Sequence, residues 1–278
     1  MKQHLYNKEE YGRRVIAGEI DLGQYYDVPA SVEVEKAKLI IAHLFEKKRE
    51  MILDLGCSLG FYSFQFVKEN KFVVGIDYEM QSLRTANKKK STLNTISEQE
   101  KNNINFLNAD ALQLPFQDEA FDKISNVDFI EHIVPEYQQR VVKEMYRILK
   151  KDGKVYMYTP NYIRVRMEYF INKMKYALKG RHYGWQESKP YKDNPELQDH
   201  QDTLLHVGLL SFEKVKRLFE SQGFIVDQVI YVEYSVPFLF SLSQKIIKTC
   251  NIKKPPFYGI FCSNSSIVFR KPRTANNL

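Results

Sequence analysis

Three acidic residues in the first half of the chain lie where short apolar runs end. Asp54 lies near the end of the first run, Asp77 follows residues 72–76, and Asp110 lies just beyond residues 104–108. Any one of these acids alone would be typical of solvated surface. Three at successive strand ends predict a shared ligand site, because the carboxyl ends of parallel strands meet at one edge of a sheet.

A glycine-rich turn accompanies the first acid, in the sequence MILDLGCSLG of residues 51–60. A dinucleotide motif starting at Gly56 would need glycine at two further positions, which Ser58 and Phe61 occupy. A carboxylate at Asp54 would repel a pyrophosphate and attract an ammonium group. The turn therefore favours a cationic ligand without phosphate over NAD, although Asp54 could equally serve only to cap the turn.

The other two acids suit a nucleoside. Asp77 is placed to accept hydrogen bonds from both hydroxyls of a ribose, and Asp110 can accept one from an adenine amino group.

Two histidines are candidates for proton transfer. His132 follows the strand expected to end near Val127 by about one helical turn, and an unperturbed histidine pKa of about 6.5 suits a general base. The alternative for His132 is a buried histidine bonded to the backbone. His206 ends a long polar and aromatic segment, where a surface position is an equal alternative. No pair of histidines or acids has the spacing of a metal site.

Alternating apolar runs and helical patterns indicate a parallel sheet covered by helices. The expected strands are 51–55, 72–76, 104–108, 123–127, 154–158, 224–234 and 266–270. Helices are expected from Phe61, over 135–150 and between Ser211 and Gly223.

The 278 residues predict one domain. Its expected parts are an N-terminal helical cap at 1–50, a ligand-binding core at 51–161, an insertion at 162–205 and a C-terminal part of the sheet at 206–278, with a basic insertion at 235–262. The net charge of +7 belongs to the residues from Ser235 onward, which include seven Lys or Arg and no acid. A charged N-terminus and three cysteines without CxxC spacing predict a cytoplasmic protein.

Within the insertion, residues 164–181 predict a basic amphipathic helix. Its apolar stripe is Met167, Phe170, Ile171, Met174, Ala177 and Leu178, and its cations are Arg164, Arg166, Lys173, Lys175, Lys179 and Arg181. Such a helix can lie on an anionic membrane, here the inner face, or cover the active site with its stripe packed on the core.

Further motifs give these features a family context: LPF at 114–116, FDKISNVDFIEHI at 121–133, LKKDGKVYMYTPN at 149–161 and HVGLLSFEKVKRLFESQGF at 206–224. Together with the three acids, they resemble the class I S-adenosylmethionine-dependent methyltransferases over roughly residues 36–234. The EHI and TPN stretches resemble the branch of ubiquinone-type O-methyltransferases and envelope-glycan enzymes.

The resemblance implies an α/β fold: a Rossmann-like, seven-stranded, mostly parallel sheet with helices on both faces and an antiparallel last strand. It implies S-adenosylmethionine over the carboxyl ends of the strands, with His132 facing the methyl group and His206 reaching the acceptor. The implied cofactor-binding residues are Asp54, Gly56, Ser58, Gly60, Asp77, Tyr78, Asp110, Ala111 and Asn126. Ser58 and Leu59 depart from the more glycine-rich version of the loop.

The expected activity is O-methylation of a small molecule, lipid or envelope glycan intermediate. A nucleic-acid methyltransferase is the alternative enzyme, favoured by the sequence pI near 9.0 but lacking an NPPY-like motif or a Pro-Cys nucleophile. A catalytically silent cofactor-binding scaffold is the alternative outside enzymes, and the intact set of three acids argues against it.

Overall fold

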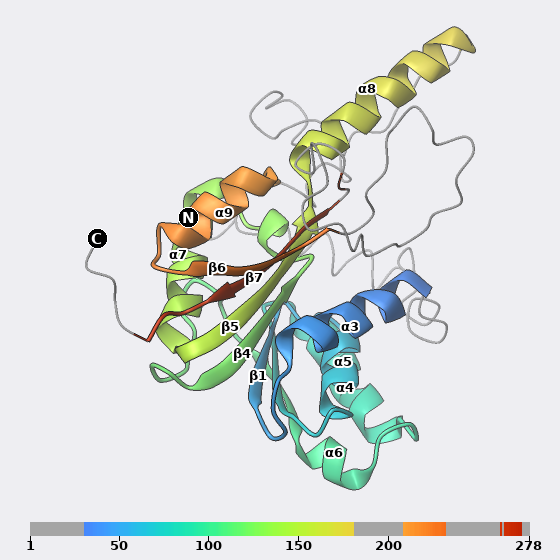
Figure 1. The fold of residues 1–278 in the computed structure, drawn as a ribbon. Coiled ribbons are helices and arrows are strands. Elements are labelled where there is room, and N and C mark those ends of the chain that lie inside the picture. The colour runs from blue at the N-terminus through green and yellow to red at the C-terminus, as the bar shows by residue number, and fades with distance from the viewer. Residues whose placement is uncertain (1–30, 181–207, 232–261, 263, 274–278) are drawn as a thin grey trace.

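The computed structural model describes residues 31–180, 208–231, 262 and 264–273. Seven strands form one sheet in the order β3-β2-β1-β4-β5-β7-β6 (Figure 1). They are β1 (Met51–Leu55), β2 (Phe72–Asp77), β3 (Ile104–Asn108), β4 (Phe121–Val127), β5 (Leu149–Pro160), β6 (Ile225–Ile230) and β7 (Asn264–Arg270). Only β7 runs antiparallel to its neighbours β5 and β6. The expected Rossmann-like sheet with an antiparallel last strand is confirmed.

Helices cover both faces of this sheet. One face carries α3 (Ser31–Leu44), α4 (Phe61–Val67) and α5 (Met80–Thr92), and the other carries α7 (Pro135–Ile148) and α9 (Phe212–Glu220) (Figure 1). Short helical segments lie at α6 (Glu98–Asn102) and η1 (Ile130–His132), and α8 (Tyr162–Leu178) extends away from the sheet.

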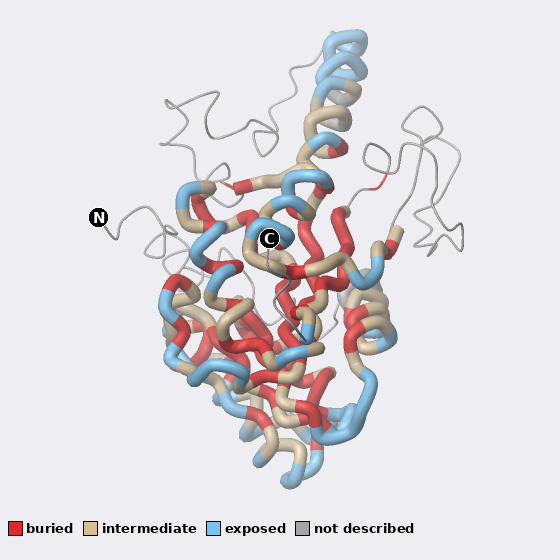
Figure 2. The backbone as a smooth tube through the Cα atoms, turned by 60° about the vertical axis from the view of Figure 1, so that its left-hand side comes forward, coloured by how far each residue is buried: buried red, intermediate tan, exposed pale blue. Residues whose placement is uncertain are grey.

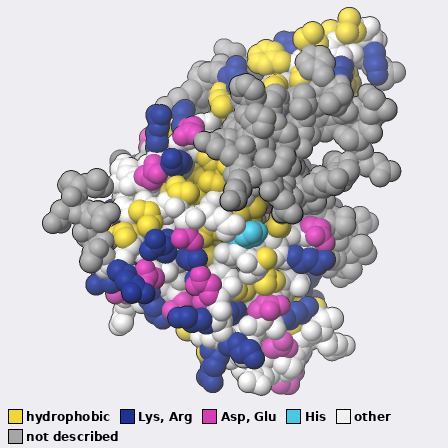
Figure 3. All heavy atoms as spheres, in the orientation of Figure 1, with side chains coloured by type: hydrophobic (Ala, Val, Ile, Leu, Met, Phe, Trp, Pro, Cys, Tyr) yellow, Lys and Arg dark blue, Asp and Glu magenta, His cyan; other side chains and the backbone are white. Residues whose placement is uncertain are grey.

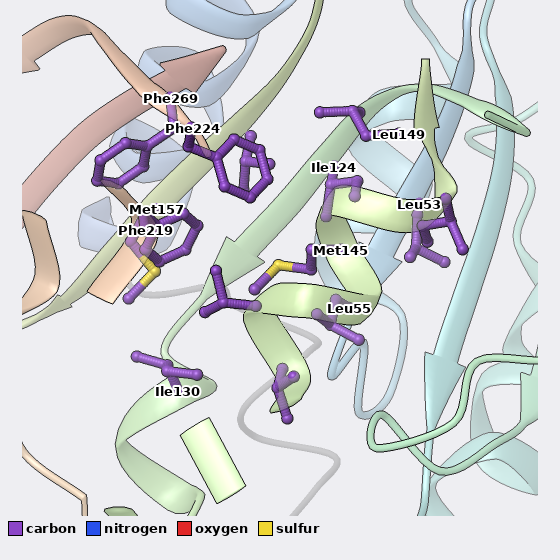
Figure 4. Close-up of a cluster of buried hydrophobic side chains, with 14 of the residues drawn as sticks. Leu53, Leu55, Ile124, Ile130, Met145, Leu149, Met157, Phe219, Phe224 and Phe269 are labelled. Carbon is purple, nitrogen blue, oxygen red and sulfur yellow. The ribbon is translucent and has the colours of Figure 1, made fainter. Parts of the chain in front are cut away.

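The strands are buried on both faces, so consecutive residues contribute to two different cores. In β1, Leu53 packs in the core beneath α7 and α9, whereas its neighbour Ile52 packs with α3 and α4. Met157 and Tyr158 of β5 divide in the same way. Figure 4 shows the first core, with Met145 of α7 among the strand residues, and Figure 2 shows buried residues concentrated in the interior of the molecule. Double-sided burial explains why these strands have apolar runs rather than strict alternation.

Most expected boundaries agree with the structure to within two or three residues. The largest difference is β5, which begins at Leu149 rather than residue 154 because Leu149 pairs with Phe121 of β4. Its other end reaches Pro160, which pairs with Asn264 of β7. Sequence patterns did not single out α5 and α6. The division into cap, core, insertion and C-terminal part stays a prediction, and most of 162–205 and 235–262 lies outside the described residues.

In the part of the chain that the structure describes, no helix combines the length and the apolar character needed to span a bilayer.

Candidate active site

The strand order identifies where a ligand would bind. The chain proceeds from β1 through β2 to β3 on one side, and β4 then starts on the other side of β1. In open α/β sheets, ligands bind at the carboxyl ends of the strands where this reversal occurs. Here the segments after β1 and β4 meet at that point, which brings the glycine turn next to the EHI stretch.

The glycine turn is tightly enclosed. Gly56 has a φ of 76° and Gly60 a φ of 80°, both in the left-handed region. A Cβ at Gly56 would lie 2.3 Å from Cδ2 of Phe129, and one at Gly60 would lie 2.6 Å from Cζ of Phe106. Steric space and backbone conformation therefore both require glycine at these two positions.

Ser58 has a backbone conformation in the left-handed region, which favours glycine. Its φ is 47°, which costs a residue with a side chain on the order of 1–2 kcal/mol. The backbone N–H of Ser58 donates to Oδ2 of Asp77 over 2.9 Å, which stabilises this conformation. The turn thus keeps a compact path despite its departure from the family pattern.

Asp77 connects the turn to α5 as well. Its Oδ1 accepts a hydrogen bond from the backbone N–H of Glu79 at 2.8 Å. Asn108, at the end of β3, donates from Nδ2 to the backbone oxygens of Asp77 at 3.1 Å and Tyr78 at 2.8 Å. These bonds fix the segment that carries the half-buried Tyr78. Asn108 is a positioning residue that sequence reasoning missed, although its place at a strand end was a usable signal.

Asp54 is buried under the turn, against α4. Its Oδ2 accepts a hydrogen bond from the hydroxyl of Ser63 over 2.6 Å. Burial raises the pKa of Asp54 to about 7, with the negative charge of Asp77 adding to the increase and the Ser63 bonds opposing it. A carboxyl group in this state gains strongly from a nearby cation, because a positive charge favours the ionised form.

Asp110 and Ala111 lie at the end of β3, both half-buried. Oδ1 of Asp110 accepts a hydrogen bond from the backbone N–H of Leu112 at 2.9 Å, which holds the turn after the strand. The three acids thus occupy the ends of the adjacent strands β1, β2 and β3, as the sequence predicted.

Asn126 has a different environment. Its side chain is fully buried and its Nδ2 donates to Sδ of Met145, on α7, at 3.5 Å. Its Oδ1 has no hydrogen-bond partner among the described residues. The side chain therefore points into the core beneath β4, and a contact between Asn126 and a cofactor stays a prediction.

His132 ends the η1 turn and is half-buried. Its backbone N–H donates to the oxygen of Phe129 over 3.0 Å. Since the Phe129 ring packs on Gly56, this turn holds His132 close to the glycine turn in the fold. The second candidate, His206, lies outside the described residues.

Glu131, next to His132, was not identified from the sequence. Its side chain is fully buried, and Oε2 accepts a hydrogen bond from the hydroxyl of Thr159 at 2.9 Å. Oε1 has no partner among the described residues. Burial, together with the charge of Asp128, raises the pKa of Glu131 to about 8. An acid within the apolar stretch 130–134 was the signal that could have drawn attention to it.

In the described ranges, no three His, Cys, Asp or Glu side chains are grouped so that they could hold a metal ion.

Comparison with known proteins adds a family to this geometry. A family described as a methyltransferase domain matches residues 53–157. The chain is 30% identical over 182 residues to the demethylmenaquinone methyltransferase of Oceanobacillus iheyensis, covering 60% of this chain and 71% of that protein. It is 27% identical over 198 residues to the protein of the same name from Listeria welshimeri, covering 68% and 75%.

A solved S-adenosylmethionine-dependent methyltransferase structure from Thermotoga maritima has a similar fold. The TM-score is 0.61 at 18% identity, over 95% of this chain and 99% of the other.

Proposed function

The chain belongs to the class I S-adenosylmethionine-dependent methyltransferases, and on that premise we propose that it methylates an oxygen of a small-molecule, lipid or envelope-glycan acceptor. The observation that carries the proposal is the enclosed turn at Gly56 and Gly60, which Ser58 joins to Asp77 and which lies over the buried Asp54. S-adenosylmethionine is the cofactor of this family.

The acids fit the parts of this cofactor. Asp54, whose pKa burial raises to about 7, suits the ammonium of the methionine portion, through a direct or a water-mediated contact. Asp77 suits the ribose hydroxyls, with Tyr78 against the adenosine. Asp110 suits the adenine amino group, with Ala111 beside it. Each assignment is supported by the position of the residue at a strand end.

When bound, the cofactor supplies an activated methyl group, so the protein mainly has to position the acceptor. Well-oriented reactants can gain on the order of 7 to 11 kcal/mol from such positioning. We assign His132 as the base that takes the hydroxyl proton as the acceptor oxygen gains the methyl group. The half-buried position of His132 beyond β4, next to the glycine turn, supports this role.

The names of the relatives support one further acceptor class. Both proteins from Oceanobacillus and Listeria are demethylmenaquinone methyltransferases. A quinone-type acceptor is therefore the second candidate for this chain, and it would be methylated at the same site.

Two measurements test the proposal. Calorimetry should give micromolar-range binding of S-adenosylmethionine and of its demethylated product, and no binding of NAD. Transfer of labelled methyl groups should then be measured with quinone, lipid and glycan fractions. His132→Ala should lower kcat by on the order of 100-fold or more while the cofactor Kd stays unchanged. An unchanged kcat would exclude His132 as the base, and absence of cofactor binding would exclude the activity itself.

A further inference from the structure

Helix α8 is anchored at its first turn and extends away from the rest of the described structure along the remainder of its length (Figure 1). At the anchored end, the side chain of Asn161 accepts a hydrogen bond from the backbone N–H of Ile163 at 3.2 Å. The N–H of Tyr162 donates to the oxygen of Leu210 over 3.1 Å. Arg164 is buried, with 1% of its surface exposed. The body of the protein therefore fixes where the helix starts and its direction.

Large apolar side chains of α8 are exposed, most strongly in its outer part. The exposed fraction is 40% for Ile163, 52% for Phe170, 66% for Met174 and 86% for Leu178. Residues spaced seven, four and four positions apart lie on one side of an α-helix. Exposure rises along the helix, and Figure 2 shows its outer part as exposed backbone. Of the predicted apolar stripe, Phe170, Met174, Ala177 and Leu178 are exposed rather than packed on the core, whereas Met167 and Ile171 are half-buried.

Cations flank this face. Lys173, Lys175 and Lys179 are exposed, and Arg166 is closer to the anchored end. The Arg166 guanidinium lies over the Phe170 ring, with its carbon 5.8 Å from the ring centroid. Figure 3 shows basic and hydrophobic side chains together on this projecting part of the molecule. Basic side chains beside an exposed apolar stripe are typical of helices that lie in the headgroup region of a membrane.

We propose that α8 binds an anionic lipid surface, with Phe170, Met174 and Leu178 inserted among the acyl chains and the lysines at the headgroups. Lysine side chains can place their apolar stems against the lipid and their charge at the phosphates. A second copy of the chain fits the face less well, because facing helices would bring cations of the same sign together. The inference does not depend on the chemistry at the active site.

Vesicle binding by the full chain tests this inference. Sedimentation with vesicles containing phosphatidylglycerol should retain the protein at low salt, and vesicles of phosphatidylcholine alone should not. Binding should fall as salt rises, because ions screen the attraction between surface charges. Lys173→Gln together with Lys175→Gln should weaken partitioning about 30-fold, as each surface cation near an anionic leaflet contributes about fivefold.

Matched variants separate the apolar and the electrostatic contributions. Met174→Ser with Leu178→Ser should also reduce binding, since two exposed apolar side chains would no longer insert. Lys214→Gln with Lys216→Gln removes the same charge from α9, whose apolar face is packed on the core, and should leave binding unchanged.

Membrane binding by α8 would be overturned by equal binding of the protein to neutral and anionic vesicles, or by an equal loss of vesicle binding when the lysine pair of α8 and that of α9 are replaced. It would also be overturned by a concentration-dependent dimer that Met174→Ser with Leu178→Ser abolishes, if neither the wild type nor this variant binds vesicles. Binding of the demethylated cofactor product to each variant should be measured by calorimetry as well. Its affinity should not change, so failure of the membrane proposal can be told apart from failure of the active-site proposal.

Discussion

Cofactor affinity should depend on pH through Asp54. Its folded pKa of about 7 means that the carboxyl is mostly protonated at pH 5.5 and half ionised at pH 7. A bound ammonium would favour the ionised form and return the pKa toward its ordinary range. Binding must therefore release a proton at low pH, and the demethylated product should bind roughly 15-fold more weakly at pH 5.5 than at pH 7.

The substitution Asp54→Asn isolates this effect. The amide keeps the shape and an oxygen that can accept from Ser63, but it cannot titrate. Affinity at pH 7 should fall by about 10- to 100-fold, since hydrogen bonds to charged groups contribute about 1.5–3 kcal/mol. The affinity of Asp54→Asn for the demethylated product should therefore not change between pH 5.5 and 7 through titration of this side chain. As a control, Asp118→Asn changes an acid with 73% of its side chain exposed and should behave like the wild type.

Calorimetry in buffers of different ionisation enthalpy counts the protons directly. The wild type should release about 0.9 proton per ligand bound at pH 6, and Asp54→Asn should release close to none. Retention of the pH slope by Asp54→Asn, or a flat wild-type profile, would refute the pairing of Asp54 with the ammonium.

Three further outcomes are expected. Asp77→Ala should weaken cofactor binding more than Asp110→Ala in calorimetry, because Asp77→Ala removes contacts to two ribose hydroxyls and Asp110→Ala removes one contact to the adenine amino group. Equal and negligible effects of the two substitutions would mean that the site is misplaced. Gly56→Ala should lower the free energy of unfolding, measured in urea, by more than about 2 kcal/mol, because the new methyl group meets the Phe129 ring. Gly180 has a φ of 64° and open space around it, so Gly180→Ala should cost only the backbone strain of about 1–2 kcal/mol. Similar losses in the two variants would show that the Phe129 ring can move aside without cost. Glu131→Gln should increase the free energy of unfolding by up to about 4 kcal/mol at pH 8 and by much less at pH 5. The buried carboxyl destabilises the fold only once it would ionise in the unfolded chain, so the native protein loses stability as pH rises from the unfolded pKa of Glu131 through its folded pKa of about 8. Equal effects of the substitution at both pH values in urea unfolding would contradict a buried, protonated Glu131.

The sheet was predictable because its signals are local. Runs of apolar residues ending in an acid gave β1 and β2 with nearly correct bounds, and a proline followed by a helical stripe gave the start of α7 at Pro135. The extension of β5 could not be predicted in the same way. The extension depends on pairing with β4 at one end and with β7 at the other. No local sequence pattern encodes which strands will pair with β5.

The sequence predicted which acidic residues lie together at the site, but not what each of them contacts. Since the carboxyl ends of parallel strands meet at one edge of the sheet, Asp54, Asp77 and Asp110 were expected at that edge. It did not reveal that Asp54 would be buried against Ser63 and therefore have a raised pKa, because burial of one side chain depends on the helix packed over it. The left-handed Ser58 was equally hidden, since its stabilising partner, Asp77, lies on another strand.

Helix α8 illustrates the same boundary between pattern and structure. Amphipathicity predicted which side chains form its apolar stripe, but a stripe is compatible with burial against the protein or against another medium. In the structure, α8 starts from an anchor at Asn161 and exposure rises from Ile163 to Leu178, so the outer part of the stripe is not buried against the protein. On the proposal that α8 binds a lipid surface, a helix anchored at Asn161 would hold the site at the strand ends close to a surface-bound acceptor. Membrane binding and acceptor delivery would then be coupled through α8, so Met174→Ser with Leu178→Ser should raise the KM for a vesicle-borne acceptor while leaving kcat and the cofactor Kd unchanged.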